Sequence, residues 1–346
     1  MTLTLVVTAL GLASFYFAYR IFALLKLPPL WRLAALAFVC LVPINAMLEV
    51  RIFRGFEGML AATLAFGVLY WVLWLAQKER VKVMELAPLA LVMGLLALTN
   101  QSAALGVYGA AGWLVLRRVP WRSWPAVGAV FAVGLVVFLA PWALRNERVL
   151  GHPVFTRSNF GLEFAQAYFP GALEAKDRRA EFIRRHAEMH PMQSVEALRQ
   201  VRTIGEVEYS GSMTRETMDW IKANPGESAQ LAARHFQEFW FPDPWVWSPF
   251  EQGEVSTKDK VKSGFVWLIT AMGLAGLALG LRRNFGGWIY VAIVLLLSSL
   301  PYVLTQPVIR YRYIVSTLLI FCAFELVHAL AEKLRLTEKH SAPASA

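Results

Sequence analysis

The feature that most constrains the fold is a series of apolar runs, each close to the length of a membrane-spanning helix. A helix needs about 20 predominantly apolar residues to cross the hydrocarbon core of a bilayer. Nine segments meet or approach that length: 2–25, 30–48, 58–77, 83–99, 101–117, 125–143, 263–281, 285–304 and 311–331. The sequence therefore predicts an all-α, polytopic membrane protein with about nine transmembrane helices.

Composition agrees, because 57% of the 346 residues are hydrophobic. The net charge of +10 would suggest nucleic-acid binding only if the basic residues formed one patch. They lie instead in short clusters between apolar runs, so we expect membrane lipids and no nucleic acid as partners. Cys40 and Cys322 each lie inside an apolar run, which favours core or lipid-facing thiols over a disulfide or metal pair. No cofactor or metal is predicted.

The basic clusters also predict the orientation, because cytoplasmic loops carry an excess of Lys and Arg. One side of the predicted bundle receives Arg20, Lys26, Arg32, Lys78, Arg80, Lys82, Arg117, Arg118, Arg122, Arg282, Arg283, Lys333, Arg335 and Lys339. The short loops of the other side hold only Arg51, Arg54, Arg310 and Arg312. We therefore expect the N-terminus outside and the C-terminus inside, in a bacterial cytoplasmic (inner) membrane.

The chain divides into four predicted regions. Residues 1–143 hold helices 1–6, 144–262 form an extracytoplasmic and mostly helical domain, 263–333 hold helices 7–9, and 334–346 form a cytoplasmic tail. Within the outer domain we expect a charged helix over 172–190, one or two helices over 194–223 with Gly205 and Gly211 as weak points, and a helix over 227–240.

One stretch at the predicted exit from the membrane is dense in groups that bind anions and sugars. It runs from Pro141-Trp142-Ala143-Leu144-Arg145-Asn146 through His152-Pro153 to Arg157-Ser158-Asn159-Phe160-Gly161. One interpretation is an interfacial turn, with Trp142 in the aromatic belt and the arginines near lipid headgroups. The other is a substrate site. The residues alone leave both open.

These motifs resemble those of GT-C class membrane glycosyltransferases, in particular glycosyltransferase family 39, the relatives of protein O-mannosyltransferases and lipid A aminoarabinose transferase. Members often carry Pro-Trp-x-x-Arg-Asn, then a Gly, then Arg-Ser-Asn-Phe-Gly. Weaker likenesses follow in the same order: Leu98-Thr99-Asn100, Ala223-Asn224-Pro225 with Phe239-Trp240, and Arg310-Tyr311-Arg312-Tyr313.

The resemblance implies transfer of a sugar from a polyprenyl-phosphate donor on the outer face of the membrane. It implies a catalytic acid in an early outer loop, for which Glu49 and Glu57 are the candidates. Arg310 or Arg312, with Arg51 or Arg54, would hold the donor phosphate. From the residues alone, these arginines could equally anchor helices by snorkelling. Arg145, Arg157 and Asn159 would line the acceptor side or brace the outer domain.

The chain departs from the family in one respect: no Asp or Glu precedes Glu49. Further helices could precede Met1, another acid could substitute, or the protein could be non-catalytic. The alternative function is therefore a GT-C-like protein that binds a lipid-linked sugar or scaffolds a glycosylation complex. A transporter is a weaker alternative, because the predicted helices hold few ionisable groups, Glu325 and His328 being the main exceptions.

His186 and His190 stand at i and i+4, a spacing that can bind zinc. The acid between them, Glu188, is not in the His-Glu-x-x-His position, and no third ligand is evident nearby. We therefore favour a solvated helix end over a zinc site.

Overall fold

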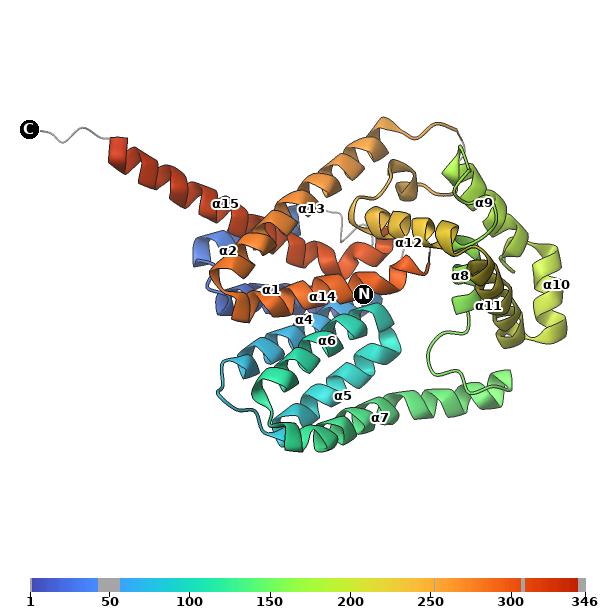
Figure 1. Ribbon diagram of the computed structural model, residues 1–346, viewed down its shortest axis with the longest axis horizontal. Coiled ribbons are helices and arrows are strands. Elements are labelled where there is room, and N and C mark those ends of the chain that lie inside the picture. Colours follow the sequence, from blue (N-terminus) through green and yellow to red (C-terminus); the bar gives the residue numbers. More distant parts are fainter. Residues whose placement is uncertain (1, 43–56, 252, 306–308, 342–346) are drawn as a thin grey trace, which may run out of the picture.

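The computed structural model describes residues 2–42, 57–251, 253–305 and 309–341, and every regular element in these ranges is a helix (Figure 1). Each of the nine predicted segments contains one. They are α1 (Thr2–Leu24), α2 (Pro29–Leu41), α4 (Glu57–Ala76), α5 (Val83–Thr99), α6 (Gln101–Arg118), α7 (Trp124–Leu150), α13 (Thr257–Arg283), α14 (Phe285–Ser299) and α15 (Tyr313–Ser341).

Six helical segments in the described ranges are long and apolar enough to cross a membrane. They lie in α1, α4, α7, α13, α14 with the short helix η4 (Leu300–Val303), and α15. Helices α2 and α5 are apolar but shorter. The chain is thus a helical, membrane-embedded protein, whereas nine spans and their orientation remain predictions.

Three helices extend beyond the boundaries predicted for their segments. The helix expected to end at residue 143 continues through Pro141 to Leu150, and Gly151 ends it in the left-handed conformation at φ 75°. Proline removes one backbone hydrogen bond, but neighbouring turns can sustain a helix through it. Helix α13 begins at Thr257, inside the predicted 144–262 domain, and α15 runs through the predicted tail as far as Ser341.

Close backbone contacts hold the membrane helices together. Helix α13 packs on α15 where a side chain at Gly276 would overlap the carbonyl of Cys322. Helix α5 packs on α7 in the same way, with Gly94 against the carbonyl of Gly134. Small residues serve this purpose in bilayers, because lipid is as apolar as a leucine side chain and association depends on close packing.

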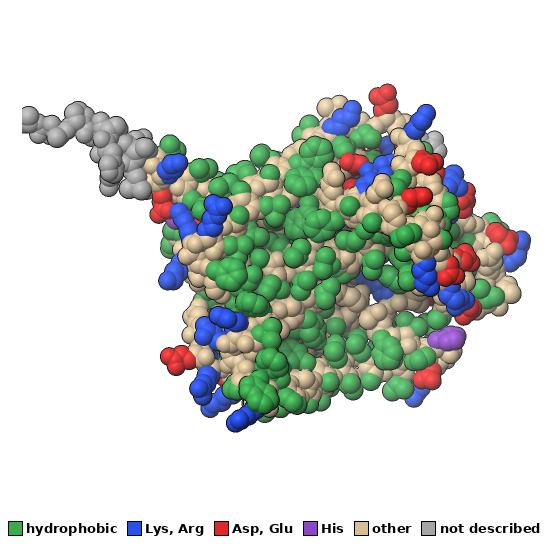
Figure 2. All heavy atoms as spheres, viewed as in Figure 1, with side chains coloured by type: hydrophobic (Ala, Val, Ile, Leu, Met, Phe, Trp, Pro, Cys, Tyr) green, Lys and Arg blue, Asp and Glu red, His purple; other side chains and the backbone are tan. Residues whose placement is uncertain are grey.

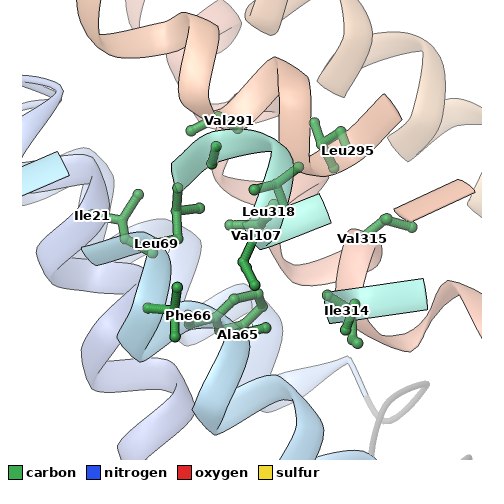
Figure 3. Close-up of a cluster of buried hydrophobic side chains, with 14 of the residues drawn as sticks. Ile21, Ala65, Phe66, Leu69, Val107, Val291, Leu295, Ile314, Val315 and Leu318 are labelled. Carbon is green, nitrogen blue, oxygen red and sulfur yellow. The ribbon is translucent and has the colours of Figure 1, made fainter. Parts of the chain in front are cut away.

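The core of the membrane half lies where α4, α6, α14 and α15 meet. Figure 3 shows Phe66, Leu69, Val107, Leu295 and Leu318 converging there from these helices. All five side chains are buried. The cluster fixes the positions of α4, α6 and α15, whose outer ends line the cavity described below.

The helices between α7 and α13 lie at one end of the molecule and are called the outer domain after their predicted location (Figure 1). It comprises α8 (Phe160–Ala167), α9 (Arg178–Met189), α10 (Val195–Ile204), α11 (Glu206–Ala223), α12 (Pro225–Trp240) and η3 (Pro244–Trp247). Of the two predicted weak points, Gly205 is confirmed, because it separates α10 from α11 at φ 87°. Gly211 does not interrupt the chain: it lies inside α11. Figure 2 shows hydrophobic side chains across the membrane helices and charged side chains gathered at the two ends.

Candidate functional site: a polar cavity between the membrane helices and the outer domain

A cavity of about 420 Å³ lies where the outer ends of the membrane helices meet the loop that leads into α8. Segments far apart in the sequence contribute to its wall. They are Gly58 and Ala61 from α4, Asn100, Gln101 and Ser102 at the start of α6, the segment from Thr156 to Glu163, Pro301, Tyr302 and Thr305 around η4, Arg310, and Tyr313 and Ile314 from α15. The wall combines amides, hydroxyls and charged groups with apolar side chains.

The Pro-Trp-x-x-Arg-Asn motif ties the loop after α7 back to the end of that helix. The Trp142 indole donates to the carbonyl of Thr156 (3.1 Å), and the Asn146 amide donates to the carbonyl of Val154 (2.7 Å). Arg145 donates to the Asn146 side chain (2.8 Å) and stacks over Trp142. These contacts set the path of the chain just before Arg157. Arg145 does not line the cavity, so its role here is positioning.

The Arg-Ser-Asn-Phe-Gly motif divides into two functions. Ser158 donates to Glu206, and the backbone N–H of Gly161 donates to the Ser210 hydroxyl (2.9 Å), both on α11. A side chain at Gly161 would overlap the Ser210 carbonyl, so glycine permits this close approach. Docked by these two residues, the motif presents Arg157 and Asn159 to the cavity.

Arg310 and Arg312 lie on one short helix, η5 (Ile309–Arg312), yet face different surroundings. Arg310 lines the cavity. Arg312 is buried and donates to the carbonyls of Phe239 and Trp240 and to the Thr270 hydroxyl (2.7 Å). Its guanidinium therefore satisfies the last carbonyls of α12 and joins that helix to α13, so Arg312 is a structural residue and Arg310 is the candidate ligand-binding one.

Asn100 and Gln101 cap the two helix ends that meet at the α5–α6 turn. The Asn100 side chain accepts from the N–H of Ala103 (2.9 Å) at the start of α6. The Gln101 amide donates to the carbonyl of Ala97 (3.0 Å) at the end of α5. Both residues also line the cavity, so the tight α5–α6 turn forms part of its wall.

Among the described residues, the charged groups that line the cavity are Arg157, Arg310 and Glu163. Two guanidiniums against one carboxylate favour an anionic ligand. Sequence reasoning missed Glu163, which lies in the first turn of α8 only two residues after the motif. Of the predicted acids, Glu57 begins α4 but its side chain lies outside the described residues, as do Glu49, Arg51 and Arg54 entirely.

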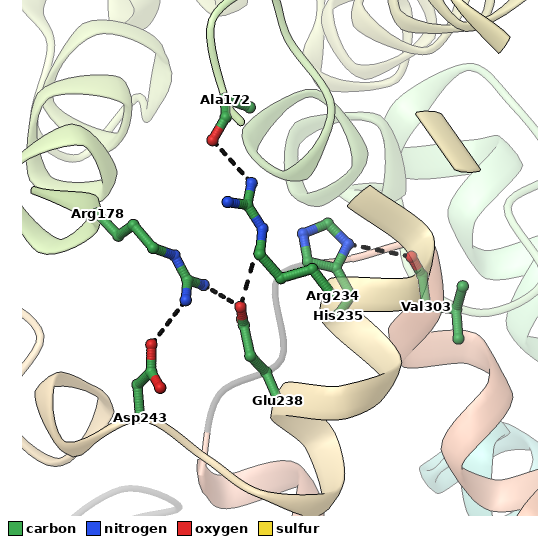
Figure 4. Close-up of polar contacts among 7 residues, drawn as sticks. All are labelled: Ala172, Arg178, Arg234, His235, Glu238, Asp243 and Val303. Atoms are coloured by element: carbon green, nitrogen blue, oxygen red, sulfur yellow. Dashed lines mark hydrogen bonds and ion pairs between the residues drawn. The ribbon is translucent and has the colours of Figure 1, made fainter. Parts of the chain in front are cut away.

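An ionic cluster around the buried Glu238 braces the outer domain (Figure 4). Arg178 pairs with Glu238 and with Asp243 (2.6 Å), while Arg234 donates to the carbonyl of Ala172 (2.7 Å). Burial raises the pKa of Glu238, although the Arg178 guanidinium opposes this. The cluster links α9, α12 and the segment before η3, so it fixes the orientation of α12.

His235 joins the outer domain to the membrane half. Its Nδ1 lies 3.2 Å from the carbonyl oxygen of Val303 in η4, and the Tyr168 hydroxyl donates to the same oxygen (2.5 Å). Burial lowers the pKa of His235 to about 4, because the cationic form loses its hydration. The neutral imidazole is therefore the form that this junction holds at neutral pH.

His186 and His190 stack with their ring centroids 4.3 Å apart. The His186 Nδ1 lies 3.2 Å from the Gln166 amide, and the His190 Nδ1 accepts from the N–H of Met192 (3.2 Å). Burial lowers the pKa of His186 to about 4. Within the described part of the chain, no group of three or more His, Cys, Asp or Glu is placed to hold a metal ion.

Neither protein-family models, nor curated proteins, nor solved structures gave a match to this chain. The fold and the site therefore define a class only: a helical membrane protein with a polar, cation-lined cavity between its membrane helices and an outer helical domain.

Proposed function

We propose that this protein is a GT-C-like integral membrane glycosyltransferase that uses a polyprenyl-phosphate sugar as donor. One observation carries the proposal: the cavity collects residues from three of the sequence segments that resemble the family. These are Asn100, the segment with Arg157 and Asn159, and Arg310. These segments lie roughly 50 to 210 residues apart in the sequence, and their convergence on one polar cavity favours a ligand site over separate interfacial anchors.

In this proposal the donor phosphate binds Arg310, with Arg157 as the second guanidinium. A guanidinium presents paired N–H groups that match two phosphate oxygens, and burial in a cavity strengthens each contact. Arg312 is excluded from this role because backbone carbonyls and the Thr270 hydroxyl engage both terminal nitrogens of its guanidinium. The prenyl chain would lie among the membrane helices.

The transfer step needs a base and stabilisation of the leaving group. The acceptor hydroxyl oxygen attacks C1 of the sugar, the bond from C1 to the phosphate oxygen breaks, and polyprenyl phosphate leaves with an additional negative charge. Arg310 and Arg157 would stabilise that charge. The acceptor proton would pass to a carboxylate. Glu163 is the described carboxylate on the cavity wall, while Glu49 and Glu57 remain predictions for the same role.

The proposed orientation places the outer domain outside the cytoplasm, with nine spans, the N-terminus outside and the C-terminus inside a bacterial inner membrane. Two reporter fusions test it. A reporter after Lys258 should behave as periplasmic, and one after Lys339 as cytoplasmic. The reverse pattern at both sites would place the cavity in the wrong compartment for the proposed reaction.

The activity itself is tested by incubating membranes that contain the protein with labelled polyprenyl-phosphate sugars and following sugar transfer. We expect transfer by the wild type and no change in Arg199→Lys, an exposed control. If Glu163 is the base, Glu163→Gln should lose activity by roughly a hundredfold or more, the usual contribution of a positioned general base. Transfer that is unchanged in both Arg310→Ala and Glu163→Gln would contradict the proposal. Binding of the lipid-linked sugar without transfer would instead favour the non-catalytic alternative.

A further inference from the structure

A second hollow lies on the surface of the membrane helices, away from the polar cavity. It is an open groove of about 480 Å³ between α1, α4 and α5. Phe17, Leu64, Gly67, Trp71 and Val92 form most of its apolar wall. The hydroxyl of Thr63, which also lines the groove, is hydrogen-bonded to the carbonyl of Met59 (2.7 Å). The groove therefore offers a hydrocarbon-lined surface to the bilayer.

One end of this groove carries a cation held by two tyrosines. Arg20 donates to the hydroxyl of Tyr16 (2.7 Å) and to that of Tyr70 (3.0 Å), and its guanidinium lies 5.3 Å from the Tyr70 ring centroid. Tyr70 also lines the groove, so the guanidinium lies at the groove's edge. Among the residues that the structure describes, no Asp or Glu forms an ion pair with Arg20.

An arginine near a membrane surface requires a counter-ion or water, because desolvating an unpaired charge is costly. Lys78, two residues after the end of α4, already pairs with Glu85 and lies over Trp74. Arg20 has two neutral tyrosine hydroxyls and the open groove instead. A lipid phosphate would supply the missing charge, and its acyl chain would fill the apolar wall.

The position of Arg20 along the helix axis indicates which leaflet supplies the lipid. Gly58 and Ala61 of α4 line the polar cavity, whereas Tyr70 lies 12 residues beyond Gly58, about 18 Å along the helix axis. Arg20 therefore lies toward the membrane face opposite the outer domain, too far along for the phosphate of a donor seated at Arg310. A resident phospholipid of the opposite leaflet fits this position.

We propose that the groove binds one acyl chain of an anionic glycerophospholipid whose phosphate pairs with Arg20. The tyrosines orient the guanidinium, and Trp71 with Trp74 flanks the acyl chain near the headgroup level, where indoles are favoured. This site does not depend on the proposed glycosyl transfer. It concerns a structural or regulatory lipid, and it stands on contacts of α1 and α4 that the cavity does not share.

The test is quenching of tryptophan fluorescence by brominated lipids added to the full-length protein in detergent. The apparent affinity from the quenching titration should be at least about fivefold higher for brominated phosphatidylglycerol than for brominated phosphatidylcholine. This is the difference expected for one arginine near an anionic headgroup. The difference in quenching between the two lipids should disappear in a Trp71→Phe, Trp74→Phe double variant. That result would locate the bound lipid at the groove.

Substitutions separate the contribution of the headgroup from that of the acyl chain. Arg20→Gln should abolish the preference for phosphatidylglycerol, and Arg20→Lys should retain part of it. Val92→Phe should weaken the binding of both lipids by filling the groove without adding a tryptophan. Arg122→Gln, a control on a separate exposed turn, should change nothing. Equal quenching of the wild-type protein by the two lipids would by itself overturn the proposal. Displacement of bound phosphatidylglycerol by equimolar polyprenyl phosphate would also overturn it.

Discussion

Different interactions stabilise the interiors of the membrane half and the outer domain. In the membrane half, glycines such as Gly276 allow backbones to touch, and the buried core is apolar. In the outer domain, the buried Glu238 ion pair and helix caps contribute, and the apolar clusters separate from the main core are small. The cavity lies at the junction. Its walls from α4, α6 and α15 are set by close packing, whereas Arg157 and Glu163 depend on polar contacts of the outer domain.

The comparison predicts that losing one buried charge destabilises the outer domain more than losing an exposed one. Glu238→Gln leaves Arg178 with only the half-exposed Asp243 and should cost roughly 3 kcal/mol of unfolding free energy, the low end for a broken buried pair. Chemical unfolding of the purified protein in detergent measures this. Glu196→Gln, which breaks an exposed pair with Arg199, is the control and should cost less than about 1 kcal/mol.

The membrane half should be sensitive to added volume rather than to lost charge. Gly276→Ala puts a methyl group into the α15 backbone and should cost roughly 1–3 kcal/mol, as overpacking does. Gly264→Ala on the same helix is the matched control, because a side chain there meets nothing within 4 Å. The measurement is the midpoint of thermal unfolding in detergent. Equal midpoints for the two variants would refute the close-packing account of α13 and α15.

A smaller, pH-dependent effect is expected at the junction. The pKa of His235 is lowered to about 4 in the folded protein, against about 6.5 in an unfolded chain. The unfolded state therefore binds more protons between these values, so His235 contributes stability above pH 6.5 that is lost progressively as the pH falls toward 4. At pH 5 the loss from this group is about 2 kcal/mol, from the cost of each pKa unit.

Comparing His235→Gln with the wild type isolates that contribution. The variant should be less stable at pH 7.5, and its stability should fall less steeply between pH 7 and pH 5. Parallel pH profiles for the two proteins would show that His235 titrates alike in both states.

Most of the fold could be predicted from the sequence, because apolar runs and helix breakers act locally. The nine helical segments, the break at Gly205 and the α12 helix from Pro225 all follow from such signals. The end of α7 could not be predicted this way. Pro141 is a helix-breaking signal, but the polar residues after it continue the helix until Gly151 ends it.

The site was less predictable, because the role of a guanidinium depends on distant partners. Arg310 and Arg312 are equivalent in the sequence, and only the approach of α12, some 70 residues earlier, assigns Arg312 to its terminal carbonyls. Glu163 carries no local signal beyond its position after the motif. The motif itself was easier to find than to interpret, since Ser158 and Gly161 serve docking rather than binding.

The most direct test of the central claim compares Arg310→Lys with Arg312→Lys for binding of polyprenyl phosphate to the purified protein. Lysine keeps the charge but loses the paired N–H groups, so Arg310→Lys should weaken binding roughly ten- to a hundredfold at unchanged stability. Arg312→Lys should lower stability and leave the affinity of the folded fraction near that of the wild type. Near-wild-type affinity in both Arg310→Lys and Arg310→Ala would show that Arg310 does not bind the donor phosphate in this cavity, and would contradict the proposed site.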